Sequence, residues 1–89
     1  MTDALQELIE ALQRASRGES IHLDEARSIR FCHPDASIDK FANECWRRLV
    51  NFSDDEDIRS RDAAYDNQMR QEMGWRAQQL SERISSGGL

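Results

Sequence analysis

The last third of the chain places its apolar residues at helical spacing, and this pattern constrains the fold more than any other feature. The stripe consists of Ile58, Tyr65, Met69, Met73, Leu80 and Ile84. Steps of four and seven residues keep side chains on one face of an α-helix. We therefore expect a helix from Ser53 to Ile84, which is longer than most helices in globular domains. Glycine favours a break, so the segment is either one long helix or two helices joined at Gly74.

The N-terminal segment predicts a helix from about Asp3 to Arg17. Its apolar stripe consists of Leu5, Leu8, Ile9, Leu12 and Ala15. Side chains at this spacing share one face, which is the face expected to enter the core. Thr2 or Asp3 is suited to cap the first turn, and Gly18 is suited to the left-handed position that ends many helices.

The middle of the chain predicts two helices separated by the single proline. A short helix is expected over 25–33, capped by Asp24, because the residue before a proline disfavours helical geometry. The next helix is expected over 35–51, opened by Asp35 or Ser37. Its apolar residues are Ile38, Phe41, Ala42, Cys45, Trp46, Leu49 and Val50. This broad face predicts the most buried helix of the chain.

Ser53 and Glu56 have the spacing of a capping box, which places the start of the last helix at Ser53. Acidic residues in the following turn suit the positive end of a helix dipole. The predicted fold is therefore all-α, a small bundle of three to four helices. One helical domain is expected over 1–84, and the serine- and glycine-rich residues 85–89 are expected to form a flexible tail.

Composition is compatible with one small, polar domain. The chain has 89 residues, of which 38% are hydrophobic and 33% charged, and its mean hydropathy is −0.81. A chain of this size buries a small core with little stability to spare. The net charge of −5 disfavours direct binding of nucleic acid, which needs clustered cations. All basic residues except Lys40 are arginines, which is typical of a GC-rich bacterial or phage genome.

The sequence predicts a cytoplasmic protein. The chain opens on an amphipathic segment with no basic and apolar leader, so we expect no signal peptide. Apolar runs are far shorter than the ~20 residues of a membrane span. Cys32 and Cys45 do not form a C-x-x-C pattern, and we expect both to be thiols in a reducing compartment.

Four residues carry the atoms of a zinc site, namely His22, Cys32, His33 and Cys45. Their spacing argues against one, because adjacent residues diverge on a helix and Cys45 belongs to an apolar face. The same spacing offers no activated thiolate beside a base. We expect no metal, no cofactor and no catalytic residue, so the chain is not predicted to be an enzyme.

Trp75 is the residue whose role depends most on the fold. If the last helix continues through Gly74, Trp75 points away from the apolar stripe and stands beside Arg76 on the surface. Exposed tryptophan and arginine are enriched at binding hot spots. If the helix breaks, Trp75 turns into the core. We expect a non-catalytic protein–protein interaction or regulatory module, whose partner is another protein or a second copy of the chain.

Two alternatives remain open. Four aspartates, Asp54, Asp55, Asp57 and Asp62, are candidate partner-binding residues, and such a row suits an inhibitor that mimics nucleic-acid phosphates. Alternatively, the helices over 25–33 and 35–51 have the layout of a helix-turn-helix DNA-binding protein. The second of these helices begins with acids where phosphates would lie, which disfavours that alternative.

Overall fold

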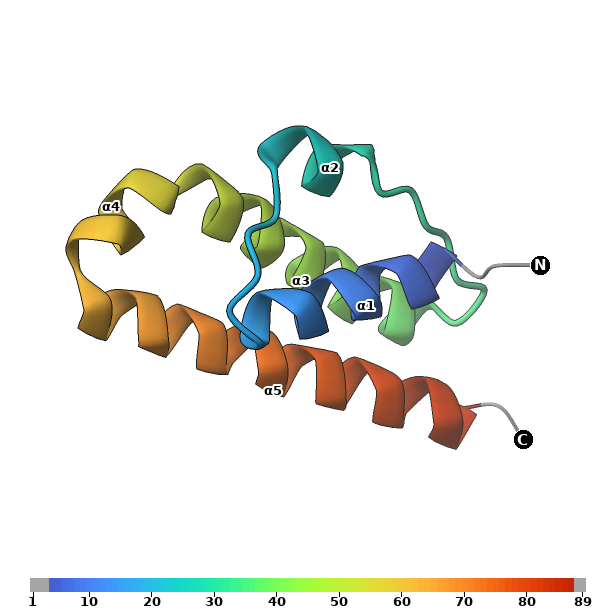
Figure 1. Ribbon diagram of the computed structural model, residues 1–89. Helices are drawn as coiled ribbons and strands as arrows, with labels where there is room; N and C mark the ends of the chain where they lie inside the picture. The colour runs from blue at the N-terminus through green and yellow to red at the C-terminus, as the bar shows by residue number, and fades with distance from the viewer. Residues whose placement is uncertain (1–3, 88–89) are drawn as a thin grey trace.

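The structure, a computed structural model, describes residues 4–87 and contains five helices and no strand in that range. The helices are α1 (Ala4–Ser16), α2 (Leu23–Ser28), α3 (Ala36–Asp54), α4 (Glu56–Arg61) and α5 (Ala63–Gly87). The all-α fold is confirmed. Helix α5 lies along both α1 and α3, and these three long helices form the bundle (Figure 1). Helix α2 packs on α3, and α4 forms the end of the bundle at which α3 turns into α5.

The core lies where α1, α3 and α5 meet. Its fully buried large side chains are Phe52, Leu5, Leu8, Leu12, Leu49, Met73, Leu80 and Cys45. The apolar stripes predicted for the first and third helices are confirmed, with Trp46 and Val50 packed at the edge of the core. In the stripe predicted for the last helix, Met73 and Leu80 are buried and Met69 and Ile84 pack against the core. Ile58 of that stripe is 51% exposed, because α4 is a separate short helix whose direction differs from that of α5.

The predicted start of the last helix at Ser53 is wrong. Helix α3 continues through Ser53 to Asp54, so the capping box does not form. The continuation carries Phe52 into the core, three residues beyond Leu49 on the same helical face. Ser53 is buried with it, and its hydroxyl has no hydrogen-bond partner among the described residues. Burial of Phe52 therefore outweighs the local capping signal.

Of the two alternatives that the sequence left open at Gly74, the structure has the continuous helix. The predicted helix is interrupted at Asp55 and at Asp62, and α5 is continuous through Gly74. A Cβ atom at Gly74 would lie 3.2 Å from the Cβ of Ser16, at the end of α1. The glycine thus allows α1 and α5 to approach closely, and its role is in helix packing.

Helix α2 is shorter than predicted. It ends at Ser28 instead of His33, because Ile29 adopts an extended backbone and turns its side chain into the core. Asp24 lies in the first turn and is not the cap. The indole N–H of Trp46 donates a 2.8 Å hydrogen bond to the carbonyl of Ala26 and so fastens α2 to α3.

Two predicted helix ends are confirmed in detail. Gly18 has φ of +97°, and the amides of Gly18 and Glu19 donate to the carbonyls of Ala15 and Arg14. This is the Schellman arrangement. The carboxylate of Asp35 accepts hydrogen bonds from the first-turn amides of α3. Thr2 and Asp3, predicted as caps of α1, lie outside the described residues.

The C-terminal end of α5 lies beyond the predicted domain boundary at residue 84. Ser85 and Ser86 are helical, and the helix ends at Gly87. The start of α1 and the end of α5 lie at the same end of the bundle, opposite α4 (Figure 1). The elongated body measures 44 × 22 × 20 Å along its principal axes.

Candidate protein-interaction surface

Trp75 stands at the midpoint of α5 on the side that faces away from the core. Because the helix is continuous, Trp75 and Met73 point in nearly opposite directions. The side chain of Met73 is fully buried, whereas Trp75 is 53% exposed. One edge of the indole packs on Phe41 of α3, with 6.5 Å between ring centroids and 82° between ring planes. This edge-to-face contact positions the indole and leaves its remaining surface free.

Each ring of this aromatic pair lies close to the guanidinium group of an arginine. Arg83 lies over the ring of Phe41 at 4.2 Å, and Arg76 lies 5.9 Å from the ring centre of Trp75. Arg76 is tethered to Glu72, at 3.3 Å, and Glu72 also pairs with Arg48 of α3 at 3.6 Å. We define the Trp75 surface as Phe41, Arg48, Trp75, Arg76 and Arg83. Trp75, Arg48 and Arg83 are exposed on this surface, whereas Phe41 belongs to the core and the side chain of Arg76 is only 14% exposed.

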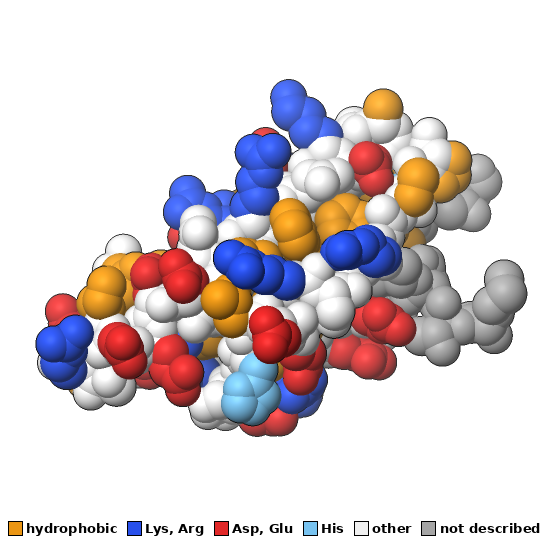
Figure 2. Space-filling model, turned by 90° about the horizontal axis from the view of Figure 1, so that it is seen from above, with side chains coloured by type: hydrophobic (Ala, Val, Ile, Leu, Met, Phe, Trp, Pro, Cys, Tyr) orange, Lys and Arg blue, Asp and Glu red, His pale blue; other side chains and the backbone are white. Residues whose placement is uncertain are grey.

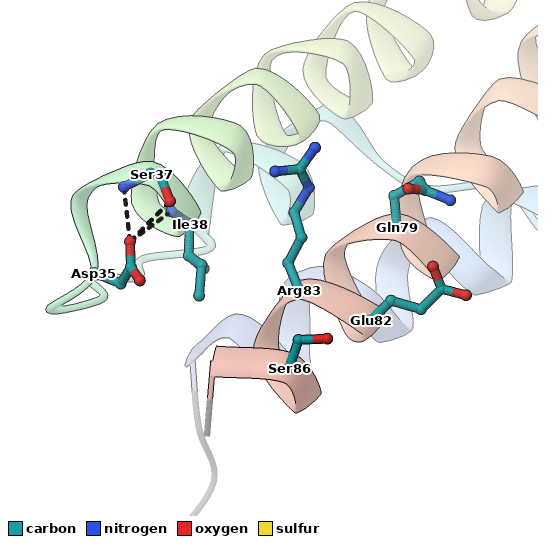
Figure 3. Close-up of a pocket in the computed structure, with 7 residues that line it drawn as sticks. All are labelled: Asp35, Ser37, Ile38, Gln79, Glu82, Arg83 and Ser86. Atoms are coloured by element: carbon teal, nitrogen blue, oxygen red, sulfur yellow. Dashed lines mark hydrogen bonds between the residues drawn. The ribbon is translucent and has the colours of Figure 1, made fainter. Parts of the chain in front are cut away.

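An open hollow continues this surface toward the N-terminal end of α3 (Figure 3). It has a volume of about 430 Å³ and is lined by Asp35, Ser37, Ile38, Gln79, Glu82, Arg83 and Ser86. The side chain of Arg83 projects into the space between α3 and α5 (Figure 3). Hydrogen bonds from the Ser37 hydroxyl and the amides of Ile38 and Ser37 lower the pKa of Asp35. The carboxylate is therefore held as an ionised cap and is a weak base.

The four predicted aspartates do not form one row. Asp55 accepts a 2.9 Å hydrogen bond from the Tyr65 hydroxyl, and this bond raises the pKa of Tyr65. Asp62 accepts the amide of Tyr65 at 3.1 Å and caps α5. Asp54 and Asp57 are exposed. Acidic side chains are spread over the face shown in Figure 2, with basic and hydrophobic side chains among them.

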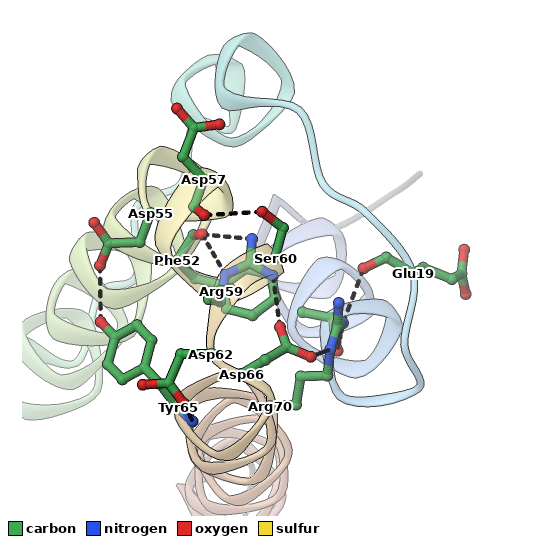
Figure 4. Close-up of polar contacts among 11 residues, drawn as sticks. Glu19, Phe52, Asp55, Asp57, Arg59, Ser60, Asp62, Tyr65, Asp66 and Arg70 are labelled. Atoms are coloured by element: carbon green, nitrogen blue, oxygen red, sulfur yellow. Dashed lines mark hydrogen bonds and ion pairs between the residues drawn. The ribbon is translucent and has the colours of Figure 1, made fainter.

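A buried ionic network that the sequence pattern did not indicate lies between α4 and α5 (Figure 4). Arg59 has a side chain that is only 4% exposed, and it pairs with Asp66 at 2.9 Å. Two of its nitrogens donate to the carbonyl of Phe52, at 3.0 and 2.7 Å, and its guanidinium lies 3.5 Å from the ring centre of Phe52. Arg59 thereby satisfies a carbonyl at the end of α3 that lacks a helical partner.

Arg70 extends the network to α1. It pairs with Asp66 at 2.9 Å and donates to the carbonyls of Ala15, at 2.6 Å, and Glu19, at 3.2 Å. Burial raises the pKa of Asp66, but the hydrogen bonds from Arg70 and Arg59 outweigh it, and the net pKa is lowered. These arginines and Asp66 join the ends of α1, α3 and α4 to α5, so we assign them a structural role.

In the last third of the sequence an acid precedes an arginine by four residues four times, a spacing that predicts four ion pairs on one helix. Two of these pairs form: Asp66 with Arg70, and Glu72 with Arg76. The other two pairs, Asp55 with Arg59 and Asp57 with Arg61, required a helix that is unbroken from residue 53. Arg59 turns inward to Asp66 instead of pairing with Asp55, and Arg61 donates to the backbone carbonyl of Asp57. The i,i+4 spacing alone did not distinguish an inward arginine from an exposed one.

The residues considered as zinc ligands are not brought together. Cys32 is exposed and Cys45 is buried, both as free thiols, and burial raises the pKa of the Cys45 thiol. The Nδ1 atom of His33 accepts the amide of Asp35. Within the described part of the chain, no three potential metal ligands cluster. None of the helices between residues 4 and 87 combines the length and apolar content of a membrane span.

Comparison with protein-family models, with curated proteins and with solved structures gave no match. The function proposed below is therefore inferred from the side chains of the Trp75 surface.

Proposed function

We propose that this chain is a non-catalytic protein–protein interaction module and that the Trp75 surface is its docking site. The observation that carries the proposal is the 53% exposure of Trp75 at the midpoint of a continuous helix, with Arg76 beside it and Arg83 over the neighbouring ring of Phe41. Tryptophan and arginine are enriched at the binding hot spots of protein interfaces. The partner is another protein or a second copy of the chain.

The chemistry of the described residues supports a non-catalytic role. In the hollow beside Arg83, Ser37 is bonded to a carboxylate whose lowered pKa makes it a poor general base. Cys45 is held away from solvent with a raised pKa, which disfavours the reactive thiolate. The two free thiols also favour a reducing compartment, and we place the module in the cytoplasm of a bacterium or an infected host cell.

Photo-crosslinking tests the proposal directly. Replacing Trp75 with benzoylphenylalanine keeps an aromatic side chain at the centre of the surface. The matched control carries the same residue at Gln13, which is exposed on α1. After irradiation in cells, position 75 should give a discrete adduct that is absent at position 13. The proposal fails if position 75 gives no more adduct than position 13.

A second candidate function is the inhibitor that mimics nucleic acid. One observation favours it: Arg61 donates to the backbone carbonyl of Asp57 and not to its carboxylate, so Asp57, which is exposed like Asp54, is less neutralised than the i,i+4 spacing indicated. Charge reversal at these two aspartates would abolish salt-sensitive binding to a basic protein, and Trp75→Ala would leave that binding unchanged. The Trp75 proposal expects the opposite dependence. A DNA-binding role gains no support, because Asp35 and Asp39 occupy the first turn of α3.

A further inference from the structure

Ile58 is an exposed apolar side chain for which the Trp75 surface gives no role. Among the described residues two large apolar side chains are exposed, Trp75 and Ile58, and that of Ile58 is 51% exposed on α4. The exposed acids Asp54, Glu56 and Asp57 precede it closely in the chain. None of these three carboxylates forms an ion pair with a described residue. We define Ile58 with these three acids as the Ile58 knob.

A hollow with an apolar floor lies between α3 and the chain that follows α2. It has a volume of about 150 Å³ and is lined by Ile29, Arg30, Phe31, Asn43 and Trp46. Phe31 and Trp46 are partly exposed and pack on the core beneath, and the hydrogen bond to Ala26 fixes the Trp46 indole. An apolar space of this size holds a group as large as a benzene ring, so an isoleucine side chain fits. We call it the Trp46 hollow.

Unpaired cations stand around the Trp46 hollow. Arg30 lines it, and Lys40 and Arg47 lie three residues before and four residues after the lining residue Asn43. Residues at these spacings are neighbours on the surface of a helix. All three cations are exposed, and none of them pairs with an acid within residues 4–87. The rim of the hollow is therefore basic, on a chain whose net charge is −5.

Two acids of α3 also lie near these cations, and neither neutralises the rim. The carboxylate of Asp39 accepts hydrogen bonds from the backbone amide of His33 and from the side chain of Asn43. Glu44 is exposed one residue after Asn43, so it points about 100° away around the helix. Figure 2 looks onto α2 and shows hydrophobic side chains near the middle of this face with basic side chains beside them.

We propose that the Ile58 knob of one copy of the chain enters the Trp46 hollow of a second copy. The charges select this occupant: acids adjoin Ile58, whereas Trp75 has an arginine beside it that would oppose the cations of the rim. Arg61, the one exposed cation of α4, is outnumbered by the three exposed acids. The contact joins two different patches, so it is heterologous and copies add one after another. This inference goes beyond the proposed function, because it does not use the Trp75 surface.

Sedimentation equilibrium tests the contact with two matched substitutions. Ile58→Ser and Trp75→Ser each remove one of the two exposed large apolar side chains. The parent chain should self-associate at concentrations up to ~1 mM, a range that detects the weak affinity of a small interface. Ile58→Ser should weaken this association roughly tenfold or more, and Trp75→Ser should leave it unchanged. A parent chain that stays monomeric, or equal effects of the two substitutions, would overturn the inference.

Charge reversal tests the role of the basic rim. Arg30→Glu places an acid beside the hollow and should weaken self-association roughly tenfold, because it would face the acids of the knob. Arg83→Glu changes the net charge equally on the Trp75 surface and should leave the association unchanged. Added salt should weaken the association of the parent chain by screening the opposite charges. Equal effects of the two reversals would assign the change to net charge and contradict the inference.

A mixture of two weakened variants tests whether the contact joins different patches. The Ile58→Ser variant keeps the hollow, and the Arg30→Glu variant keeps the knob. At a concentration where each variant alone is monomeric, the mixture should form a one-to-one dimer whose mass does not grow beyond two chains. A mixture that stays monomeric would contradict a heterologous contact. Circular dichroism checks that each variant keeps the helical content of the parent chain.

This inference and the proposed function fail independently, because they use different surfaces. Self-association that depends on Ile58, without an adduct specific to position 75, keeps the knob contact and removes the Trp75 surface as a docking site. A chain that stays monomeric but crosslinks from position 75 to a partner removes the knob contact and keeps the proposed function.

Discussion

Arg59 donates two hydrogen bonds to the carbonyl of Phe52 and one to Asp66, with its guanidinium stacked on the Phe52 ring. A buried cation is tolerated only when its donors are satisfied and a counter-charge is close. Here the counter-charge, Asp66, is shared with Arg70, which in turn holds the end of α1. One side chain thus sets how three helix ends meet.

Arg59→Ala should destabilise the fold by about 3 kcal/mol, because Asp66 and the Phe52 carbonyl lose their partner in a buried setting. Urea unfolding followed by circular dichroism measures the effect. Arg61→Ala is the matched control, since Arg61 is exposed and donates only within α4. Its expected cost is below ~0.5 kcal/mol. Similar costs for the two variants would show that Arg59 is not a buried connector.

The lowered pKa of Asp66 predicts a loss of stability in acid. The unfolded chain binds a proton at this residue below about pH 3.9, while the folded chain keeps it ionised to lower pH. The contribution of Asp66 is therefore fully present above the unfolded pKa and is lost as pH falls through the folded pKa. The difference in unfolding free energy between the parent and Asp66→Asn should shrink below about pH 4. A pH-independent difference would contradict this assignment.

Substitutions at Gly74 distinguish a role in helix packing from a role as a hinge. Gly74→Ala gains roughly 1 kcal/mol of helix propensity but places a Cβ 3.2 Å from Ser16, so the net change in stability should be within about 1 kcal/mol. Gly74→Leu should cost about 2 kcal/mol or more, because the larger side chain forces α1 away from α5. Thermal unfolding compares the two. Full tolerance of leucine would exclude the close approach.

At the scale of the element, α5 owes its start to Asp62. The carboxylate accepts the amide of Tyr65, and the backbone carbonyl accepts the amide of Asp66. The residue has extended backbone angles, φ −137° and ψ 95°, which end α4 and open α5. The outward direction of Trp75 follows, because it depends on where this helix begins and on its continuity through Gly74.

Asp62→Ala should cost about 1 kcal/mol through loss of the cap. Asp57→Ala is the control, since the backbone carbonyl of Asp57, and not its carboxylate, accepts the bonds from Ser60 and Arg61. Amide hydrogen exchange should show faster exchange at the start of α5 in the first variant only. Equal exchange in both variants would assign the break to backbone packing alone.

At the scale of the whole molecule, the described residues share one core. Helix α2 is fastened to α3 by Trp46, and α4 is fastened to α5 by the buried network. Small domains with a single core unfold in one cooperative step. In the Trp75→Phe variant, Trp46 fluorescence should therefore change at the same urea concentration as the helical signal. Separate transitions would indicate that α2 detaches first.

The sequence by itself determined the features that depend on near neighbours. The stripe of α1, the glycine end at Gly18 and the cap at Asp35 follow from helical spacing and from hydrogen bonds within a few residues. The all-α class follows from the same periodicity. The exposure of Trp75 was one of two outcomes that the sequence left open, because both agreed with the local pattern.

Only the tertiary structure decided where the last helix begins and what Gly74 and Arg59 do. Burial of Phe52 extends α3 past its local stop signal, and Gly74 meets Ser16, which is far away in the sequence. Arg70 likewise reaches the carbonyl of Ala15 across the bundle. These contacts join residues that are distant along the chain, so their energies appear only once the helices have packed, and local propensity cannot encode them.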